Sequence, residues 1–510
     1  MNSNRKWWAL AALDLGVLAV GLDVTVLSVA LPTLAGSLKA SESDLQWFSS
    51  AYALMLAAGM LPAGVLGDRF GRKRVLAAAL FVFAAGSIAC AFATSPAQFI
   101  AGRVLLGAAG SAIVVMALSV MTVLFAEEER PRAVGIWAAA NFLALPVGPI
   151  FGGWLLTSYW WGWIFLMNVP VAVLGIVAVS ALVPESRAAA KPALDPAGML
   201  AVTGSLVAVT YGLIELGRNG WTHAPSLAVL AAGILLGAGF VAWERRLGSR
   251  PGGRPLIDLA LFKSRGFTWG TLLAALGGLA LIGLVFTLPQ YSQGVLGLDP
   301  QGSGVRLLPL IAGMIAGAVP ADRLAKRFGP KVTVAVGFGI TAAGLLLGAR
   351  TGVDSPAWFV AAWTAVVGAG MGIGFATAAS AALKTVPSEK SGVASALIQA
   401  VQKVGAPLGS AIFGSILVTV YQSALDLTGV PPAAVHAVRQ SVFAGVAVAS
   451  GLHSVALLDS VRQAFVHGMD TALVYSAAIA ALAMVAALLF LPGREVAIVS
   501  SEEQIVQGVA

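Results

Sequence analysis

The sequence predicts an all-α polytopic membrane protein with fourteen transmembrane helices, arranged as two six-helix bundles plus two inserted helices. Three observations lead to this prediction: a very apolar composition, recurring apolar segments near 20 residues long, and a partial repeat between the two parts of the chain. Of the 510 residues, 58% are hydrophobic and 11% are charged, and the mean hydropathy is +0.88. Because soluble proteins have roughly 25% charged residues, most of this chain must face lipid.

Fourteen apolar segments are each long enough to cross about 30 Å of hydrocarbon as a helix. They lack the strict alternation of membrane β-strands, so helices are expected. The first segment follows Arg5 and Lys6, but it is too long for the apolar part of a signal peptide and is interpreted as a retained span. The predicted spans are 7–31, 45–66, 75–94, 97–125, 133–157, 163–183, 196–215, 225–243, 267–289, 305–322, 332–349, 357–383, 392–420 and 471–491.

Basic residues indicate the orientation, because cytoplasmic loops carry an excess of Lys and Arg. With the N-terminus inside and the loops assigned alternately, 23 of the 31 Lys and Arg lie on the inner side, six lie on the outer side, and Arg103 and Lys403 lie within spans. A missed or spurious span would reverse every later loop and remove this bias. The sequence therefore predicts a multi-pass cell-membrane protein with both termini in the cytoplasm.

Several classes of protein are disfavoured by what the sequence contains. The net charge of +8 is scattered over many short loops, whereas nucleic acid needs a clustered basic face; membrane lipids are the expected partner instead. The one cysteine, Cys90, permits no internal disulfide or thiolate metal cage. The sequence has no phosphate-binding loop of the kind that ATP-driven pumps use, and no His, Asp or Cys cluster that would indicate a membrane enzyme. We therefore predict no enzymatic activity, no cofactor and no metal site.

Two pairs of similar segments suggest that the chain is built from two related halves. DRFGRK (68–73) follows the second span and KRFGPK (326–331) follows the tenth. VGPIFGG (147–153) in the fifth span is echoed by GAPLGSAIFGS (405–415) in the thirteenth. Such internal repeats are typical of secondary transporters, which bind substrate between the repeats. The predicted divisions are an N-terminal bundle (1–187), an inserted pair (188–265), a C-terminal bundle (266–495) with an outer loop (421–470), and a cytoplasmic tail (496–510).

The outer loop has apolar spacings that predict two short amphipathic helices on the outer face. The first spacing involves Val435, Val438 and Val442, and the second runs from Leu452 to Phe465. These helices would either gate the exit from the bundle or cover it.

The loop GVLGDRFGRKR (64–74) joins the second and third spans. Gly64 and Gly67 permit close helix approach, and Asp68 lies at a helix end before four basic residues. An acid there can bond the backbone N–H groups of a neighbouring helix and pair with Arg72, in one conformation but not in another. The alternative is an ordinary positive-inside loop. The predicted conformational switch comprises Gly64, Asp68, Arg69, Gly71 and Arg72.

This loop resembles the signature G-x-L-x-D-R-x-G-R-K-x-x-L of the major facilitator superfamily from Gly64 to Leu76. LDVTVLSVALP (22–32) is similar to the first-span signature of its fourteen-span drug:proton antiporters, with Ser28 in place of the usual Asn. The fourth-span motif is matched by Arg103, Gly107, Gly110 and Ala112. The fifth-span antiporter motif is matched by Gly135, Gly148, Pro149, Gly152 and Gly153, with Ala144 in place of one Gly. In WGWIFLMNVP (161–170), Gly162 replaces the usual Arg.

The resemblance implies a monomeric multidrug efflux antiporter of the bacterial inner membrane, which exports small amphipathic compounds in exchange for protons by alternating access. It assigns proton and substrate coupling to Asp23 and Arg103, and sealing of the cavity to the fifth-span motif. The residues themselves place Asp23 about 12 Å and Arg103 about 9 Å from the outer ends of their helices. The two can therefore pair; a static structural ion pair is the alternative.

Other charges within spans are assigned less active roles. Asp14 lies about half a turn round the helix from Asp23 and is interpreted as structural. Lys403 lies near mid-bilayer, and with Gln399 and Gln402 it predicts a polar stripe facing the substrate cavity; a bond to a backbone carbonyl away from substrate is the alternative.

With Asp23 as the only deep acid of the N-terminal bundle, monovalent cations, zwitterions or neutral amphiphiles are expected as substrates. A nutrient symporter is disfavoured by the fifth-span motif, whereas an exporter of a lipid or endogenous metabolite remains the alternative function.

Overall fold

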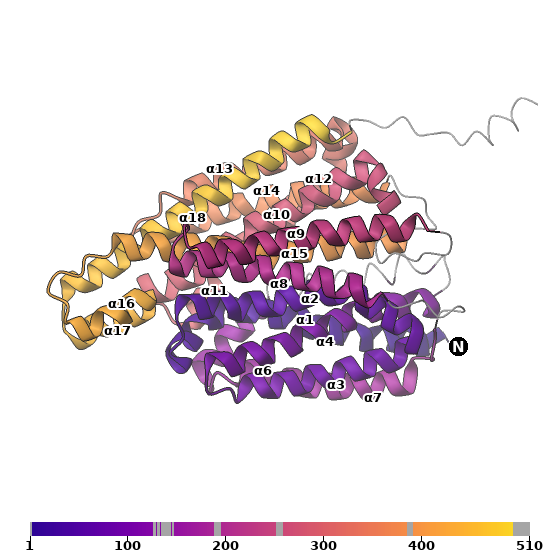
Figure 1. Cartoon of the computed structure of the whole chain (residues 1–510), viewed down its shortest axis with the longest axis horizontal. Helices are drawn as coiled ribbons and strands as arrows, with labels where there is room; N and C mark the ends of the chain where they lie inside the picture. Colours follow the sequence, from indigo (N-terminus) through magenta and orange to yellow (C-terminus); the bar gives the residue numbers. More distant parts are fainter. Residues whose placement is uncertain are drawn as a thin grey trace, which may run out of the picture.

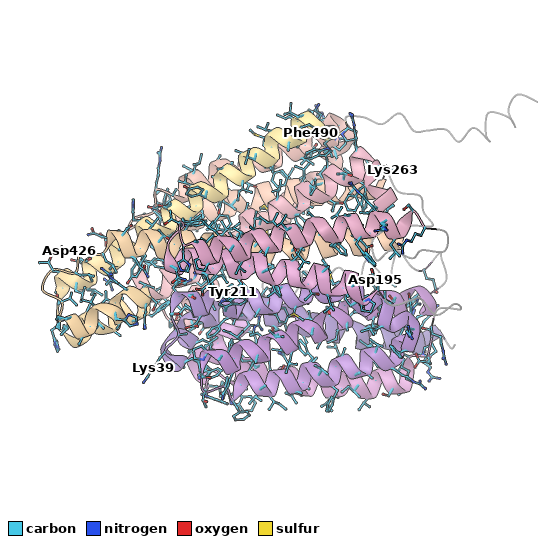
Figure 2. All side chains as sticks on the ribbon, viewed as in Figure 1. Lys39, Asp195, Tyr211, Lys263, Asp426 and Phe490 are labelled. Carbon is cyan, nitrogen blue, oxygen red and sulfur yellow. The ribbon has the colours of Figure 1, made fainter. Side chains whose placement is uncertain are left out.

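The structure, a computed structural model, describes residues 3–125, 129, 133, 144, 147–187, 195–250, 259–384 and 391–492. Within these ranges the chain forms helices joined by short connections, with no β-strand. The helices lie side by side along the long axis of the molecule (Figure 1). We call the end that carries α16 and α17 the distal end, and the end that carries the N-terminus of α1 the proximal end. Lys39 marks the distal end in Figure 2, and Asp195 and Lys263 mark the proximal end.

The helices fall into an N-terminal group, a C-terminal group and a pair between them. The N-terminal group comprises α1 (Ser3–Leu38), α2 (Glu42–Phe70), α3 (Arg72–Ala91), α4 (Pro96–Leu124), a helical segment over 147–158, α6 (Trp163–Leu166) and α7 (Asn168–Leu182). The pair is α8 (Pro196–Asn219) and α9 (Ala224–Gly248). The C-terminal group comprises η1 (Leu259–Lys263), α10 (Arg265–Gln290), η2 (Tyr291–Val295), α11 (Pro300–Val305), α12 (Leu308–Phe328), α13 (Pro330–Gly348), α14 (Ala357–Lys384), α15 (Ser391–Ala424), α16 (Pro432–Gln440), α17 (Val442–Gly451) and α18 (Val455–Phe490).

Local sequence signals set where several helices begin. Ser41 caps α2 in a reciprocal capping box, in which the Ser41 side chain bonds the Asp44 N–H and the Asp44 carboxylate bonds the Ser41 N–H. Ser95 caps α4 and Asp195 caps α8, and each is followed by a proline at the first helical position. Pro62 lies inside α2, where the helix bends by 50° because proline removes a backbone hydrogen bond.

The structure does not confirm the predicted number of fourteen spans, because twelve or thirteen are seen among the described residues. Twelve helices are long and apolar enough to cross a membrane, and the bent α2 brings the number to thirteen. Of the remaining predicted span, 133–157, the structure describes 133, 144 and 147–157. The protein is therefore a multi-pass helical membrane protein.

The sequence repeat corresponds to a repeated turn in the structure. Gly71 ends α2 and begins α3 with φ +108°, and Gly329 ends α12 and begins α13 with φ +84°. Both glycines lie in DRFGRK and KRFGPK at the same position, and positive φ is accessible to glycine without steric cost. The two helix pairs are therefore joined by the same kind of tight turn.

Packing within the two groups is also related. In the N-terminal group α2 and α3 pack on α4, and α1 and α3 pack on α7. In the C-terminal group α12 and α13 pack on α14, and α10 and α13 pack on α18. The α12–α14 contact is especially close, because a Cβ atom at Gly317 would lie 2.1 Å from the Ala369 carbonyl oxygen. Small residues at such crossings are the usual means of helix association in membranes.

The pair α8 and α9 lies at the edge of the seam between the two groups, as Figure 1 shows. α8 packs on α2 of the N-terminal group and on α15 of the C-terminal group. Ser415 Oγ of α15 donates to the Leu213 carbonyl of α8 at 2.8 Å, and the rings of Trp47 and Tyr211 meet between α2 and α8. The pair thus contacts both groups from outside.

The helices of the predicted outer loop differ in part from the expectation. The first predicted spacing is divided between two helices, because Val435 and Val438 lie in α16 and Val442 begins α17. The second spacing, Leu452 to Phe465, does not form a separate short helix, because α18 runs without a break from Val455 to Phe490. Val461 and Phe465 are buried by packing against neighbouring helices of the C-terminal group, including α17, whereas Leu452 and Val455 are exposed.

Candidate functional site

Asp23 and Arg103 form an ion pair inside the N-terminal group. An Arg103 guanidinium nitrogen lies 2.5 Å from Asp23 Oδ2, and each side chain is 1% exposed. Asp23 comes from the middle of α1, and Arg103 lies two turns into α4, whose start is set by the Ser95 cap. Their matched depths in the two helices bring the charges together.

Neutral groups complete the surroundings of this pair. Asn168, the first residue of α7, donates to Asp23 Oδ1 at 3.4 Å. Arg103 Nε donates to the Phe48 carbonyl at 3.1 Å, and the guanidinium lies 4.3 Å from the centre of the Tyr52 ring. The pair is therefore held by a carboxylate, a carbonyl and an aromatic face, and no second formal charge joins it in the described part of the chain. A neutral carboxyl at Asp23 would leave the Arg103 charge without its counter-ion.

A cavity of about 80 Å³ adjoins Arg103 where the two helix groups meet. The N-terminal group contributes Arg103, Tyr52 and side chains of α1, and the C-terminal group contributes Ile282, Phe286 and Ser410. Its walls are mostly apolar with few polar groups, as in small-molecule sites, but its volume in this conformation is well below the roughly 300–1,000 Å³ of such sites. The ion pair is thus adjacent to a space that both groups form.

Residues of the fifth-span motif pack against α1 next to the ion pair. A Cβ atom at Gly148 would lie 1.9 Å from Thr25 Oγ1, and one at Gly152 would lie 2.6 Å from Val26 Cγ1. Thr25 Oγ1 also donates to the Ala144 carbonyl at 3.0 Å. Only glycine permits this approach, so the helical segment over 147–158 lies directly on α1. Gly135 of the same motif lies outside the described residues.

The same segment contacts the C-terminal group at the distal end. A Cβ atom at Gly153 would lie 2.7 Å from the Gln301 Cα, and one at Gly304 would lie 2.3 Å from the Pro149 carbonyl oxygen. Elsewhere at this end, Gln293 Nε2 donates to the Val29 carbonyl at 2.9 Å. The two groups are therefore in close backbone contact here, between the fifth-span motif and α11.

The 64–74 loop is held at the proximal end within the N-terminal group. Arg72 donates to Asp68 Oδ1 at 2.9 Å and 3.1 Å, and to the Ser119 carbonyl of α4 at 3.3 Å. Asp68 was expected to bond backbone N–H groups of a neighbouring helix and to pair with Arg72; among the described residues, the pair with Arg72 is the contact that it makes. Arg69 lies over the Phe70 ring at 5.7 Å.

Two glycines of this loop differ in how tightly they are packed. A Cβ atom at Gly67 would lie 2.2 Å from Met116 Sδ, whereas one at Gly64 would meet Val115 at an ordinary 3.7 Å.

Sequence reasoning also missed Glu185, which follows α7. Its carboxylate accepts from the Lys73 backbone N–H at 3.2 Å and lies 3.6 Å from Arg74 Nε. In the sequence Glu185 lies 112 residues from Lys73, so no local pattern linked it to this loop.

The predicted polar stripe on α15 is only partly described. Gln402 is half-buried and lies one turn before Ala406, which lines the cavity, but Gln402 is not itself among the cavity residues. The side chains of Gln399 and Lys403 lie outside what the structure describes. Their role at the substrate cavity stays a prediction.

Asp23 is not the only buried acid of the N-terminal group. Asp14 is 8% exposed and Glu42 is 5% exposed, and each has one carboxylate oxygen without a hydrogen-bond partner. Glu42 was missed because it lies just before the predicted second span, in a stretch of polar residues that reads as a loop. Tertiary contacts with the C-terminal group bury it there. Asn168 was also missed, although an amide in an apolar segment is a signal for a polar contact.

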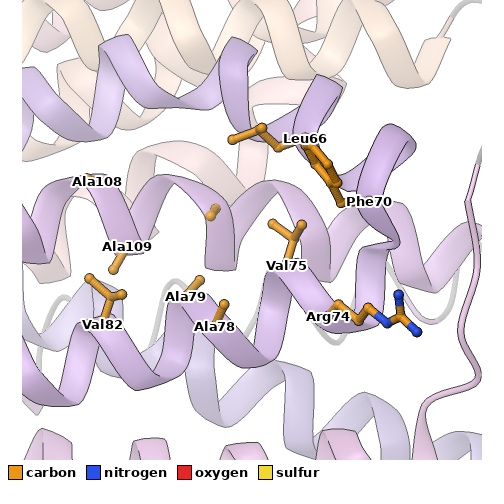
Figure 3. A pocket seen from close by; sticks show the side chains of 10 residues that line it. Leu66, Phe70, Arg74, Val75, Ala78, Ala79, Val82, Ala108 and Ala109 are labelled. Atoms are coloured by element: carbon orange, nitrogen blue, oxygen red, sulfur yellow. The ribbon is translucent and has the colours of Figure 1, made fainter. Parts of the chain in front are cut away.

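A second hollow of about 550 Å³ lies between α2, α3 and α4, away from the ion pair (Figure 3). It is lined by alanines and by larger apolar residues such as Phe70 and Val82, with Arg74 at one end. Phe70 is 53% exposed, so this groove lies on the outside of the N-terminal group. It contains no acid and is not part of the candidate site.

A helical membrane bundle with a repeated turn, two related helix groups and a cavity beside a buried ion pair defines a membrane transporter. Residues 13–410 match the family model of the Major Facilitator Superfamily, and the chain belongs to this family. Members of this family are transporters, not enzymes.

Characterised relatives are export and resistance proteins. The chain is 32% identical to the tetracenomycin C resistance and export protein of Streptomyces glaucescens, over 95% of this chain and 91% of that protein. It is 34% identical to the multidrug efflux pump LfrA of Mycolicibacterium smegmatis, over 95% of each chain. It is 30% identical to the methyl viologen resistance protein SmvA of Salmonella typhimurium, over 92% of this chain and 95% of that protein.

Solved structures share the fold at low sequence identity. A bacterial homologue of the human lysosomal transporter Spinster, in an inward-facing and unoccupied conformation, superposes with a TM-score of 0.68 at 17% identity, covering 96% of this chain and 98% of that one. A D-xylose–proton symporter superposes with a TM-score of 0.60 at 16% identity, covering 96% and 98%.

Proposed function

We propose that this protein is a proton-coupled antiporter that exports amphipathic drugs or toxic compounds by alternating access. The observation that carries the proposal is the buried Asp23–Arg103 pair beside a cavity formed by both helix groups. The relatives that confer resistance and export support a drug as the cargo. In this function protons and a small amphipathic compound are the partners, and lipid surrounds the protein.

The coupling follows from the charge balance of the pair. A proton on Asp23 neutralises the carboxylate and weakens its hold on Arg103, whose charge then favours a conformation in which water or substrate reaches it. Removing one charge from a buried pair costs about 3–5 kcal/mol. That is enough to reverse a conformational preference, since 1.4 kcal/mol changes the ratio of two conformations tenfold.

The membrane arrangement that accompanies this function has the distal end outside the cell. In this proposal the protein has fourteen spans and keeps both termini in the cytoplasm. It lies in a bacterial inner membrane and acts as a monomer. Its divisions are a bundle over 1–187, an inserted pair over 188–265, a bundle over 266–495 and a tail over 496–510. The excess of Lys and Arg in the proximal loops supports this orientation.

The function is tested with inverted membrane vesicles, in which the outer side of the protein faces the lumen. An acidic lumen is expected to drive uptake of several unrelated dyes and antibiotics, and a protonophore is expected to abolish this uptake. Uptake that ignores the pH gradient would contradict proton coupling. A protein that alters lipid export but moves no dye would support the alternative, an exporter of a lipid or endogenous metabolite.

Asp68→Asn is expected to favour conformations closed at the distal end and to slow turnover, with substrate affinity little changed. The partly exposed Asp68–Arg72 pair is worth no more than about 1 kcal/mol in the conformation described. In Asp68→Asn, a bond that Asp68 makes to a helix end only in the distal-open conformation would be lost completely. A difference of 1–2 kcal/mol shifts the populations about five- to thirtyfold.

The shift is measured by labelling single cysteines at the two ends with a membrane-impermeant reagent. Arg74→Gln, which removes a nearby exposed charge outside the predicted switch and leaves the Asp68–Arg72 pair, is the matched control. Labelling of Asp68→Asn that equals labelling of the parent protein would leave the loop with a topological role only.

The charge of the substrate tests the predicted stripe on α15. Because further buried acids are present, the argument against bivalent cations now rests on Lys403. A cation about 10–20 Å from a substrate repels each extra positive charge on that substrate by about 1–2 kcal/mol, at an effective dielectric constant of about 20. Lys403→Gln is therefore expected to raise export of methyl viologen, a bivalent cation, about five- to thirtyfold relative to a monovalent dye. An unchanged ratio would remove Lys403 from the substrate path.

A further inference from the structure

Glu42 is a buried acid at the distal end that the proposed cycle does not yet use. It is the first residue of α2, directly after the Ser41 cap, and it is 5% exposed. Carboxylates at a helix start are common, but they normally face water. Here Oε1 of Glu42 has no hydrogen-bond partner. The burial comes from the C-terminal group, because α15 packs along α2.

The groups that face Glu42 are neutral. Gln290 at the end of α10 lies within hydrogen-bonding reach of the Glu42 carboxyl, and its own Oε1 has no partner. From α15 the phenol of Tyr421 lies close enough to interact with the charge on Glu42. On its own helix, Asp44 is engaged in the capping box with Ser41. No Lys or Arg of the described residues forms an ion pair with Glu42.

A row of buried polar residues runs from Glu42 along α2 to the cavity. Gln46, one turn further, is 1% exposed and lies against Gly414 of α15, where a Cβ atom would be 2.5 Å from Gln46 Cγ. After another turn, the hydroxyls of Ser50 and Ser410 are hydrogen-bonded at 2.5 Å. Ser410 lines the cavity beside Arg103. Glu42 therefore lies at the distal end of the α2–α15 contact that closes over the cavity.

Because Glu42 is buried without a cation, the conformation closed at the distal end favours its protonated form over its ionised form. An ionised carboxylate in a dry contact is costly, whereas a protonated carboxyl is neutral and can donate to the unpaired oxygen of Gln290. When the helix groups separate at this end, water reaches the carboxyl and stabilises the ionised form. Closure and proton binding at Glu42 are therefore linked.

We propose that Glu42 is a second proton site, distinct from Asp23: closing the distal end binds one proton at Glu42, and opening it releases that proton to the same side. The site rests on the proposed alternating access, to which it adds a gate that senses the pH outside. Acid outside favours closure, and one linked proton changes the ratio of open to closed protein by at most about tenfold per pH unit.

The test measures opening of the distal end directly, without substrate or a proton gradient. Ala53, which lines the cavity, is replaced by Cys in protein that carries Cys90→Ala and Asp23→Asn, so that Asp23 cannot contribute to the pH dependence. Right-side-out vesicles are labelled with a membrane-impermeant maleimide between pH 6 and pH 8. Labelling of Lys39→Cys, at an exposed distal position, corrects for the intrinsic effect of pH on the thiol.

With Glu42 present, the corrected labelling rate is expected to rise by about tenfold or more over these two pH units. In Glu42→Gln it should stay within about twofold of the rate at low pH, because the amide resembles the protonated carboxyl. Glu42→Asp should restore a pH dependence. Asp44→Asn, which removes the neighbouring acid and weakens the helix cap, should leave the pH dependence intact.

The outcomes separate the gate site from the proposed function. The same pH dependence with and without Glu42 would overturn the gate site, as would a parallel rise in labelling at every pH, which indicates a merely structural contact. No labelling of Ala53→Cys at any pH in any variant would overturn alternating access, and the gate site with it.

Discussion

Asp23→Asn is expected to abolish proton-driven accumulation of substrate while leaving the protein folded. One coupled proton and a gradient of two pH units supply about 2.7 kcal/mol, which is enough for about hundredfold accumulation of substrate. Asparagine can still bond Arg103, but it cannot bind and release a proton. Purified protein in liposomes should therefore lose this accumulation. Exchange of substrate without a gradient should continue, because it needs no change of protonation.

The matched control for this variant is Asp14→Asn. Asp14 lies on the same helix and is also buried, but it is not part of the Arg103 pair. It is expected to keep gradient-driven accumulation near the level of the parent protein. Normal accumulation by well-folded Asp23→Asn would refute the coupling role and leave the pair as a static structural contact.

Gly304→Ala is expected to prevent closure at the distal end and to reduce export strongly. The added Cβ would lie 2.3 Å from the Pro149 carbonyl oxygen, and neither backbone can give way without separating the two helix groups. Overpacking of this kind costs about 1–3 kcal/mol. Since the contact joins the groups only when this end is closed, the cost falls on that conformation, and its population should fall about five- to 150-fold.

Labelling of Ala53→Cys from the distal side measures the effect, which should appear as faster labelling together with slower export. Gly153→Ala, which would press on the Gln301 backbone from the opposite side, should act in the same direction. Gly36→Ala is the control, because a Cβ atom there meets no atom within 4 Å. Normal export by both Gly304→Ala and Gly153→Ala would contradict the role of this contact in sealing the cavity.

The sequence by itself determined the class of fold and the position of the central ion pair. Helix length and apolarity set the membrane spans, because these properties belong to each segment alone and need no knowledge of its neighbours. The repeat of a glycine between two helices was visible in DRFGRK and KRFGPK and recurs as the same positive-φ turn. Asp23 and Arg103 could be paired in advance, since depth along a helix follows directly from residue number.

Only the tertiary structure decided which polar groups are dry and which glycines are in tight contact. Glu42 precedes an apolar segment and reads as part of a loop, yet packing between α2 and α15 buries it. The apolar spacing after Leu452 was compatible with a short surface helix, but contacts with α17 and other neighbouring helices make it part of α18. Likewise Gly67 rather than Gly64 makes the close contact of the 64–74 loop. Burial of these residues depends on which helices become neighbours, and that is a property of the assembled chain rather than of any local pattern.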